Sequence, residues 1–128
     1  MSTQEKYDLL MDSCFGGVTG IVQTIVYKKA VELYFLFLNS ENTFADWKDQ
    51  ACRAASSVGA NLCEGYGRGT PGQKTQFYKY ARGSVYECVH WANLGEKQRE
   101  PLLQKALELA SLVDGELMTV AREAQEIS

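Results

Sequence analysis

Apolar residues recur at intervals of three and four along most of the chain, which is the spacing of an amphipathic helix. Glycine, proline and runs of polar residues interrupt this pattern and divide it into four long segments. We therefore expect helices at about 18–38, 44–64, 71–94 and 101–126. No segment alternates apolar and polar residues convincingly, as a half-buried strand would. Four long helices joined by short loops predict an all-α, up-down-up-down four-helix bundle.

Sequence signals at the helix ends support these boundaries. Thr70 is placed to cap the third helix, with Pro71 in the first helical position and Gln73 completing a capping box. Thr43 is the expected N-cap of the second helix, with Asp46 at its third position. The fourth helix begins near a first-position proline, and Gly95 follows the third helix as its expected C-cap.

A short segment precedes the first long helix. Ser2 and Glu5 have the spacing of a capping box at the start of a segment that reaches Cys14. The glycine pair at 16–17 then breaks the helical pattern. We therefore divide the chain into an N-terminal extension at 1–17 and a bundle domain at 18–128.

The periodic apolar positions predict the residues that face the core. They are Ile21, Ile25, Tyr27 or Lys28, Val31, Tyr34 and Leu38, then Phe44, Trp47 or Lys48, Ala51, Ala55, Val58 and Leu62, then Phe77, Ala81, Ser84 or Val85, Cys88 and Ala92, and finally Leu103, Ala106, Ala110, Val113, Leu117, Val120, Ala124 and Ile127.

The second half of the first helix has more apolar surface than one core stripe needs. From Ala30 to Leu38 the only charged residue is Glu32, so this helix is apolar on all sides. A helix of that kind is covered on more than one side, and we expect a second copy of the chain to supply the additional cover. Gly83 interrupts the third helix at a cost of about 1 kcal/mol relative to alanine, so we expect a close backbone approach there.

Composition places the chain among ordinary soluble globular proteins. It has 128 residues, of which 45% are hydrophobic and 23% charged. The first ten residues show no apolar signal-peptide core. The longest apolar run, Leu33 to Leu38, is far shorter than the roughly 20 residues of a membrane span. We expect a cytoplasmic protein that does not contact membranes. The cysteines form no CxxC motif and are expected to be reduced, buried thiols: Cys14, Cys52, Cys63 and Cys88.

Charge is distributed unevenly along the chain. The stretch from residue 53 to residue 82 has a net charge of +4, whereas the whole chain has −3. Aromatic residues interleave with its cations, a combination that suits phosphate contact and base stacking. The alternative is a solvated surface whose cations form ion pairs; repetition around an oligomer would instead create a basic band. The candidate nucleic-acid-binding residues are Arg53, Arg68, Lys74, Lys79 and Arg82.

Three further patterns carry possible chemistry. In an antiparallel pair of helices, residues 53 and 87 lie at about equal height, so we expect Arg53 and Glu87 to form a structural ion pair; the alternative is a site carboxylate held by an arginine. Glu87 and His90 have the E-x-x-H spacing of di-metal bundles, which need two such motifs, and the chain has one histidine. The glycine-rich loop at 65–70 lacks phosphate-loop spacing but suits an isolated backbone phosphate near Arg68. We expect no metal and no cofactor.

The middle of the chain contains motifs that resemble a known family. The motifs are Arg53-Ala54-Ala55, Asn61-Leu62-Cys63-Glu64-Gly65, Gly67-Arg68, and Ala81-Arg82-Gly83-Ser84 followed by Glu87. With residues 26–33 (VYKKAVEL), they resemble the four-helix bundle proteins encoded in intervening sequences of bacterial large-subunit ribosomal RNA genes. The same superfamily includes the accessory variability protein of diversity-generating retroelements. The motif residues that we single out as structural are Asn61, Glu64, Gly65, Gly83 and Glu87.

The resemblance implies a homo-oligomer, usually a pentameric ring, without enzyme activity. Its retroelement branch implies binding of RNA or DNA and of a reverse transcriptase. Together with the charge pattern, it predicts a non-catalytic nucleic-acid-binding or scaffold protein. The alternative is a structural protein-interaction ring with no nucleic-acid role. An enzyme is the least supported class, because the sequence offers a single histidine and no nucleophile with a partner base.

Overall fold

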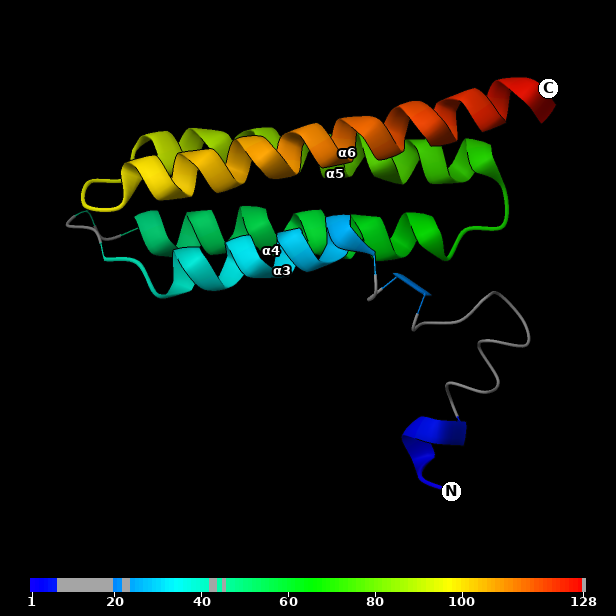
Figure 1. Ribbon diagram of the computed structural model, residues 1–128, viewed down its shortest axis with the longest axis horizontal. Coiled ribbons are helices and arrows are strands. Elements are labelled where there is room, and N and C mark those ends of the chain that lie inside the picture. The colour runs from blue at the N-terminus through cyan, green and yellow to red at the C-terminus, as the bar shows by residue number, and fades with distance from the viewer. Residues whose placement is uncertain (7–19, 22–23, 42–43, 45, 128) are drawn as a thin grey trace.

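The fold is that of a computed structural model, which describes residues 1–6, 20–21, 24–41, 44 and 46–127. Four long helices make up most of this part of the chain: α3 (Ile25–Leu38), α4 (Trp47–Tyr66), α5 (Pro71–Asn93) and α6 (Arg99–Ile127). Consecutive helices run in opposite directions, with α3 and α4 in one layer and α5 and α6 in the other (Figure 1). Each helix packs against two neighbours, α3 against α4 and α6, and α5 against α4 and α6. The predicted all-α bundle is therefore present in the described residues.

The first and second helices begin later than predicted. Thr24 adopts an extended backbone conformation, and its hydroxyl accepts a hydrogen bond from the Tyr27 N–H at 3.3 Å, so it is the N-cap of α3. The start predicted near residue 18 lies outside the described residues, and Thr24 interrupts any continuous helix from there. Helix α4 begins at Trp47 with Asp46 as its N-cap. The predicted cap at Thr43 is wrong for this helix, and that residue also lies outside the described residues.

Helix α5 begins as the sequence predicts. The Thr70 hydroxyl accepts a hydrogen bond from the Gln73 N–H at 3.3 Å, and Pro71 takes the first helical position. At its other end, the cap residue is Leu94 rather than Gly95. Helix α6 begins at Arg99, two residues before the proline that was expected to start it.

The capping box predicted at the N-terminus is confirmed. The Glu5 N–H donates to the Ser2 hydroxyl at 3.1 Å, and the Ser2 N–H donates to the Glu5 carboxylate at 3.4 Å. Residues 3–6 are helical. The rest of the predicted first segment, including Cys14 and the glycine pair, lies outside the described residues, so the extension at 1–17 stays a prediction.

The core lies between the two layers of helices and is formed by four stripes. Most predicted positions in α4, α5 and α6 are buried. In α5, Tyr78 is buried in place of the predicted Phe77. In α6, Leu102 and Leu109 are buried, whereas the predicted Leu103 and Leu117 are half-buried. The stripes are Val26, Ala30, Leu33 and Phe37; Trp47, Ala51, Ala54, Ala55, Val58, Leu62 and Gly65; Tyr78, Ala81, Val85, Cys88 and Ala92; and Leu102, Ala106, Leu109, Ala110, Val113 and Val120.

Of the stripe predicted for the first helix, Ile21 is buried and Tyr27, Val31 and Tyr34 are half-buried, but Ile25 and Leu38 are wrong. Ile25 is 65% exposed and Leu38 is 40% exposed, whereas the buried face begins at Val26. Because α3 is apolar all round, several rotations about its axis satisfy the same spacing. Contacts with α4 and α6 select the rotation, and these contacts are not encoded in the local pattern.

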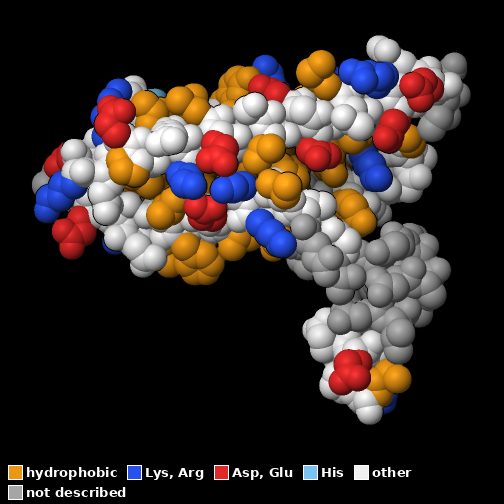
Figure 2. Space-filling model, viewed as in Figure 1, with side chains coloured by type: hydrophobic (Ala, Val, Ile, Leu, Met, Phe, Trp, Pro, Cys, Tyr) orange, Lys and Arg blue, Asp and Glu red, His pale blue; other side chains and the backbone are white. Residues whose placement is uncertain are grey.

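A network of four charges joins α3 to α6. Lys29 lies 3.2 Å from Glu108, and Lys105 lies 3.1 Å from Glu32. Along each helix, Lys29 also contacts Glu32, and Lys105 contacts Glu108. In Figure 2, blue and red side chains meet where these two helices pack. The hydrogen bond and charge of Glu108 raise the pKa of Lys29, and the hydrogen bond from Lys105 lowers the pKa of Glu32. These pairs are partly exposed and individually weak, so we infer that they help to set the register of α3 on α6 more than they stabilise the fold.

Gly65, in the last turn of α4, and Gly83, within α5, have opposite surroundings. A Cβ atom added to Gly65 would lie 2.6 Å from Cε1 of Tyr78 and 3.2 Å from Cβ of Phe77. A Cβ atom added to Gly83 would meet no atom within 4 Å. The close approach predicted at Gly83 is therefore wrong within this chain, because that residue lies on the outer surface of α5. The close approach occurs at Gly65 instead.

Candidate nucleic-acid interface

The outer surface where α4 and α5 meet, here called the α4–α5 seam, contains most of the motif residues. The hydroxyls of Ser57 and Ser84 share a hydrogen bond of 2.9 Å across it. The Asn61 side chain donates to the Ser57 carbonyl at 2.9 Å and to the Ser57 hydroxyl at 3.2 Å. The bond between Ser57 and Ser84 marks the register of the two helices, in which residues whose numbers sum to about 141 lie opposite each other. That register agrees closely with the one expected from the sequence.

The predicted pair of Arg53 and Glu87 does not form. Arg53 lies 3.0 Å from Asp49, one turn earlier on its own helix. Glu87 accepts a hydrogen bond of 3.3 Å from the indole N–H of Trp91, one turn later on α5. The height of the two residues was predicted correctly. Each side chain instead takes a partner at i±4, which requires no reach across the seam.

One end of the seam combines cations with aromatic rings. The Arg68 guanidinium lies 4.5 Å from the centre of the Phe77 ring and contacts Glu64 at 3.5 Å. The Phe77 ring in turn meets the Tyr80 ring edge-on, with 5.7 Å between their centres and 86° between their planes. We call Tyr66, Arg68, Lys74, Phe77, Lys79 and Tyr80 the basic-aromatic end.

Of the other two cations of this end, one lies beside an aromatic ring and the other is next to an aromatic residue in the sequence. The Lys74 ammonium lies 5.5 Å from the centre of the Tyr66 ring. Lys79 is exposed and precedes Tyr80 on α5. From Gly65 to Tyr80 the sequence has three cations and no acidic residue. Glu64, at the edge of this stretch, is the acid that contacts Arg68.

Arg82 belongs to a different surface. Its Nε donates to Asp114 at 2.7 Å, and its Nη2 donates to the Tyr86 hydroxyl at 2.9 Å. The Tyr86 hydroxyl donates to the second Asp114 oxygen at 3.1 Å, which closes a three-residue cluster between α5 and α6. The hydrogen bond to Asp114 raises the pKa of Arg82. The Asp114 carboxylate therefore offsets the charge that Arg82 would offer to a phosphate.

The five predicted cations thus divide into three groups. Arg68, Lys74 and Lys79 lie at the basic-aromatic end. Arg53 lies about 22 Å from Arg68 along α4, from fifteen residues at 1.5 Å each, and Arg82 faces α6. The cross-seam hydrogen bond between Ser57 and Ser84 was not predicted, and only the repeated small residues in α4 gave a signal for it.

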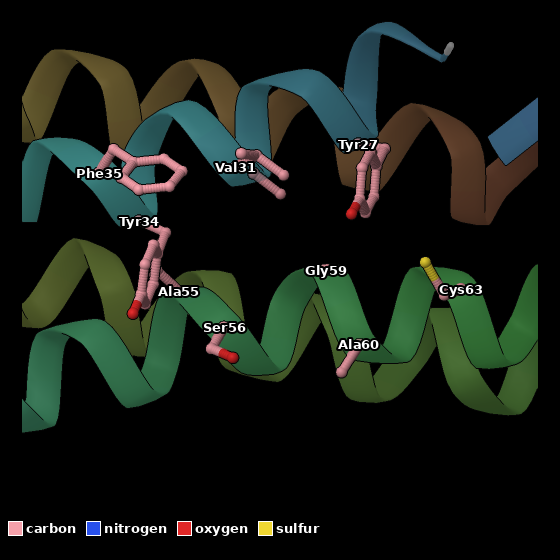
Figure 3. Close-up of a pocket in the computed structure, with 10 residues that line it drawn as sticks. Tyr27, Val31, Tyr34, Phe35, Ala55, Ser56, Gly59, Ala60 and Cys63 are labelled. Carbon is pink, nitrogen blue, oxygen red and sulfur yellow. The ribbon is translucent and has the colours of Figure 1, made fainter. Parts of the chain in front are cut away.

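Part of the apolar surface of α3 lines a groove between α3 and α4 (Figure 3). Its volume is about 360 Å³. The Tyr27 and Tyr34 side chains extend toward α4, whose small residues leave the groove open. Phe35 lies at its edge and is 51% exposed. The lining residues are Tyr27, Ala30, Val31, Tyr34 and Phe35 from α3, and Ala55, Ser56, Gly59, Ala60 and Cys63 from α4.

The cysteines differ in burial. Cys88 is buried, and burial, with a smaller contribution from Glu87, raises the pKa of its thiol to about 12. Cys52 and Cys63 are only half-buried, so the prediction of fully buried thiols is wrong for these two. Cys14 lies outside the described residues. Within the described part of the chain, no group of three or more His, Cys, Asp or Glu side chains is placed to hold a metal ion.

None of the helices described is both long enough and apolar enough to cross a bilayer.

Comparison with protein families gives one match. The model of the family described as 23S rRNA-intervening sequence protein matches residues 23–114. No curated protein and no solved structure matches the chain. The matched stretch spans α3, α4 and α5, more than half of α6, and the whole of the α4–α5 seam. On the strength of that coverage, the chain belongs to the 23S rRNA-intervening sequence protein family.

Proposed function

We propose that this protein is a non-catalytic, oligomeric scaffold that binds nucleic acid through its basic-aromatic end. The family name points to RNA as the first candidate, and the retroelement resemblance adds DNA and a reverse transcriptase as further candidate partners. The observation that carries the proposal is the run from Gly65 to Tyr80, which holds Arg68, Lys74 and Lys79 without an acidic residue. We place this role in the cytoplasm.

Phosphate contact is the chemistry that these three cations suit. Binding of Lys and Arg to a phosphate backbone releases condensed counterions, so affinity falls steeply as salt rises. Several copies in one assembly would multiply a modest charge per subunit. Arg53 and Arg82 contribute less in this proposal, because Asp49 and Asp114 contact them at 3.0 and 2.7 Å, closer than the 3.5 Å between Glu64 and Arg68.

Substitution of the three cations tests the proposal. The variant Arg68→Ala/Lys74→Ala/Lys79→Ala is expected to bind RNA at least about tenfold more weakly than the unsubstituted protein at low salt. Its plot of log affinity against log salt should also be shallower, by about 0.7 for each lost contact to a single strand. Fluorescence anisotropy with labelled RNA and DNA over a series of salt concentrations measures both quantities.

The matched control is Lys28→Ala/Lys48→Ala/Lys97→Ala, which removes the same charge from exposed positions outside the basic-aromatic end. It should bind nearly as the unsubstituted protein does. Absence of binding at low salt, or equal affinity of the two triple variants, would remove the proposal. A stable assembly without RNA or DNA binding would favour the alternative, a protein-interaction ring whose partner meets the acidic remainder of the surface.

Self-association is the second part of the proposal. Exposed apolar side chains gather on α3, where Ile25, Phe35, Leu36 and Leu38 are all exposed. Of these, Phe35 lines the groove between α3 and α4, which small residues leave open. A patch of this kind on a small protein marks an interaction surface. We assign it to a second copy of the chain, and the resemblance suggests five copies in a ring.

Charge placed at the edge of this groove should disrupt the assembly. We expect the unsubstituted protein to sediment as a pentamer of about 72 kDa, five times the 14.3 kDa of one chain, and Phe35→Glu to shift it toward the monomer. Met118→Glu, at an exposed apolar residue on α6, should leave the assembly intact. Sedimentation equilibrium measures the masses, and a monodisperse monomer at high protein concentration would contradict this part of the proposal.

A further inference from the structure

Tyr80 lies at the surface, where its ring packs against one neighbouring ring. Its side chain is 51% exposed. The rest of the ring packs edge-on against Phe77. Phe77 is itself in contact with the Arg68 guanidinium, which lies 4.5 Å from the centre of its ring. An exposed aromatic ring held in this way loses little conformational freedom when a flat ligand stacks on it.

Polar groups around Tyr80 match the other parts of a nucleotide. Lys79 is exposed about 100° around α5 from Tyr80, and Arg68 contacts Phe77, so cations are available for the flanking phosphates. The register of the seam places Asn61 opposite Tyr80. Its amide nitrogen donates to Ser57, so its amide oxygen is the atom left to accept a hydrogen bond from a base.

A stacking site of this kind discriminates between single strands and duplexes. In a duplex each base is already stacked on its neighbours and paired, so its face is not available to a side chain. In a single strand the face is available, and stacking on one aromatic side chain contributes about 1–3 kcal/mol. Phosphate contacts alone would not produce this difference.

We propose that the basic-aromatic end is a single-strand site in which an unpaired base stacks on Tyr80 while Arg68 and Lys79 contact the adjacent phosphates. This inference rests on the nucleic-acid binding proposed above and specifies its ligand as single-stranded nucleic acid. Asn61 accepts a hydrogen bond from an amino group of the stacked base. RNA and DNA share this chemistry, so the experiment includes both.

Binding of three labelled oligonucleotides to the full chain tests the site. They are a 12-nucleotide RNA, the DNA of the same sequence, and the same RNA annealed to its complement. At equal salt, we expect the single-stranded RNA or DNA to bind at least about tenfold more tightly than the duplex. Tyr80→Ala should weaken single-strand binding at least about fivefold, leave duplex binding unchanged and leave the salt dependence unchanged.

Two variants control for other effects of the substitution. Tyr80→Phe keeps the ring and should retain single-strand affinity. Tyr86→Ala removes an aromatic residue of similar exposure, 44%, from the α5–α6 side and should also retain it. Circular dichroism of each variant checks that the helices are intact, which we expect because Tyr80 lies outside the core.

The possible outcomes separate this inference from the proposed function. Equal affinity for single strand and duplex overturns the single-strand site, and so does unchanged single-strand binding by Tyr80→Ala. Nucleic-acid binding itself still stands in either case if the triple alanine variant binds more weakly than the unsubstituted protein. A similar loss of single-strand and duplex binding in Tyr80→Ala also overturns the single-strand site. If the unsubstituted protein binds none of the three oligonucleotides, both proposals fail.

Discussion

Replacement of Trp47 by alanine will lower the free energy of unfolding by about 3–5 kcal/mol. Trp47 is 1% exposed at the start of α4, and its ring meets Phe37 of α3 edge-on, with 5.6 Å between their centres. Its indole N–H donates a 2.7 Å hydrogen bond to the carbonyl of Trp91 in α5. One side chain thus joins three helices, and its removal leaves both a cavity and a carbonyl without its donor.

One further variant separates the hydrogen bond of Trp47 from the burial of its ring, and a second serves as a control. Trp47→Phe keeps most of the buried ring but loses the hydrogen bond to Trp91, so we expect a loss of about 1–3 kcal/mol. Phe44→Ala removes an exposed ring from the preceding loop and should change stability by less than about 0.5 kcal/mol. Urea unfolding followed by circular dichroism measures all three. A loss below about 1.5 kcal/mol for Trp47→Ala would show that this end of the bundle is not held as described.

Local signals in the sequence predicted α5 better than α3, for a physical reason. The N-terminus of α5 depends on contacts between residues three apart, such as the Thr70 hydroxyl and the Gln73 N–H, and short-range contacts of this type are visible in a sequence. The rotation of α3 depends on how two other helices pack against it. Its all-round apolar surface leaves several rotations equally compatible with the spacing.

At the candidate interface too, the sequence predicted what depends on local geometry but not the contacts of single side chains. Helix register was predictable, because loop length and antiparallel geometry place residues 53 and 87 at equal height. The partners were not, because Asp49 and Trp91 lie one turn away on the same helices and compete with the contact across the seam. Among the cations, Arg82 lies one helical turn after Lys79 on α5, but Asp114 on α6 already contacts it, and that long-range partner is not visible in the local sequence.

The last prediction concerns Gly65→Ala. The sign of the change in the free energy of unfolding shows whether close packing or helix propensity dominates at this residue. Alanine is the better helix former by about 1 kcal/mol, yet we expect Gly65→Ala to destabilise the protein by about 1–3 kcal/mol. The new methyl group would lie 2.6–2.7 Å from two ring carbons of Tyr78, a buried side chain that would have to shift. Because it would also press on Phe77, single-strand binding should weaken although every cation remains.

Gly83→Ala is the matched control, since it makes the same substitution in the interior of α5. A Cβ atom there meets nothing within 4 Å, so propensity alone acts and stability should rise by about 0.5–1 kcal/mol. Opposite signs for the two substitutions in urea unfolding are the expected result. Stabilisation by Gly65→Ala would mean that α4 and α5 lie further apart at Tyr78 than described, and the position of Phe77 and Tyr80 at the surface would then lose its physical basis.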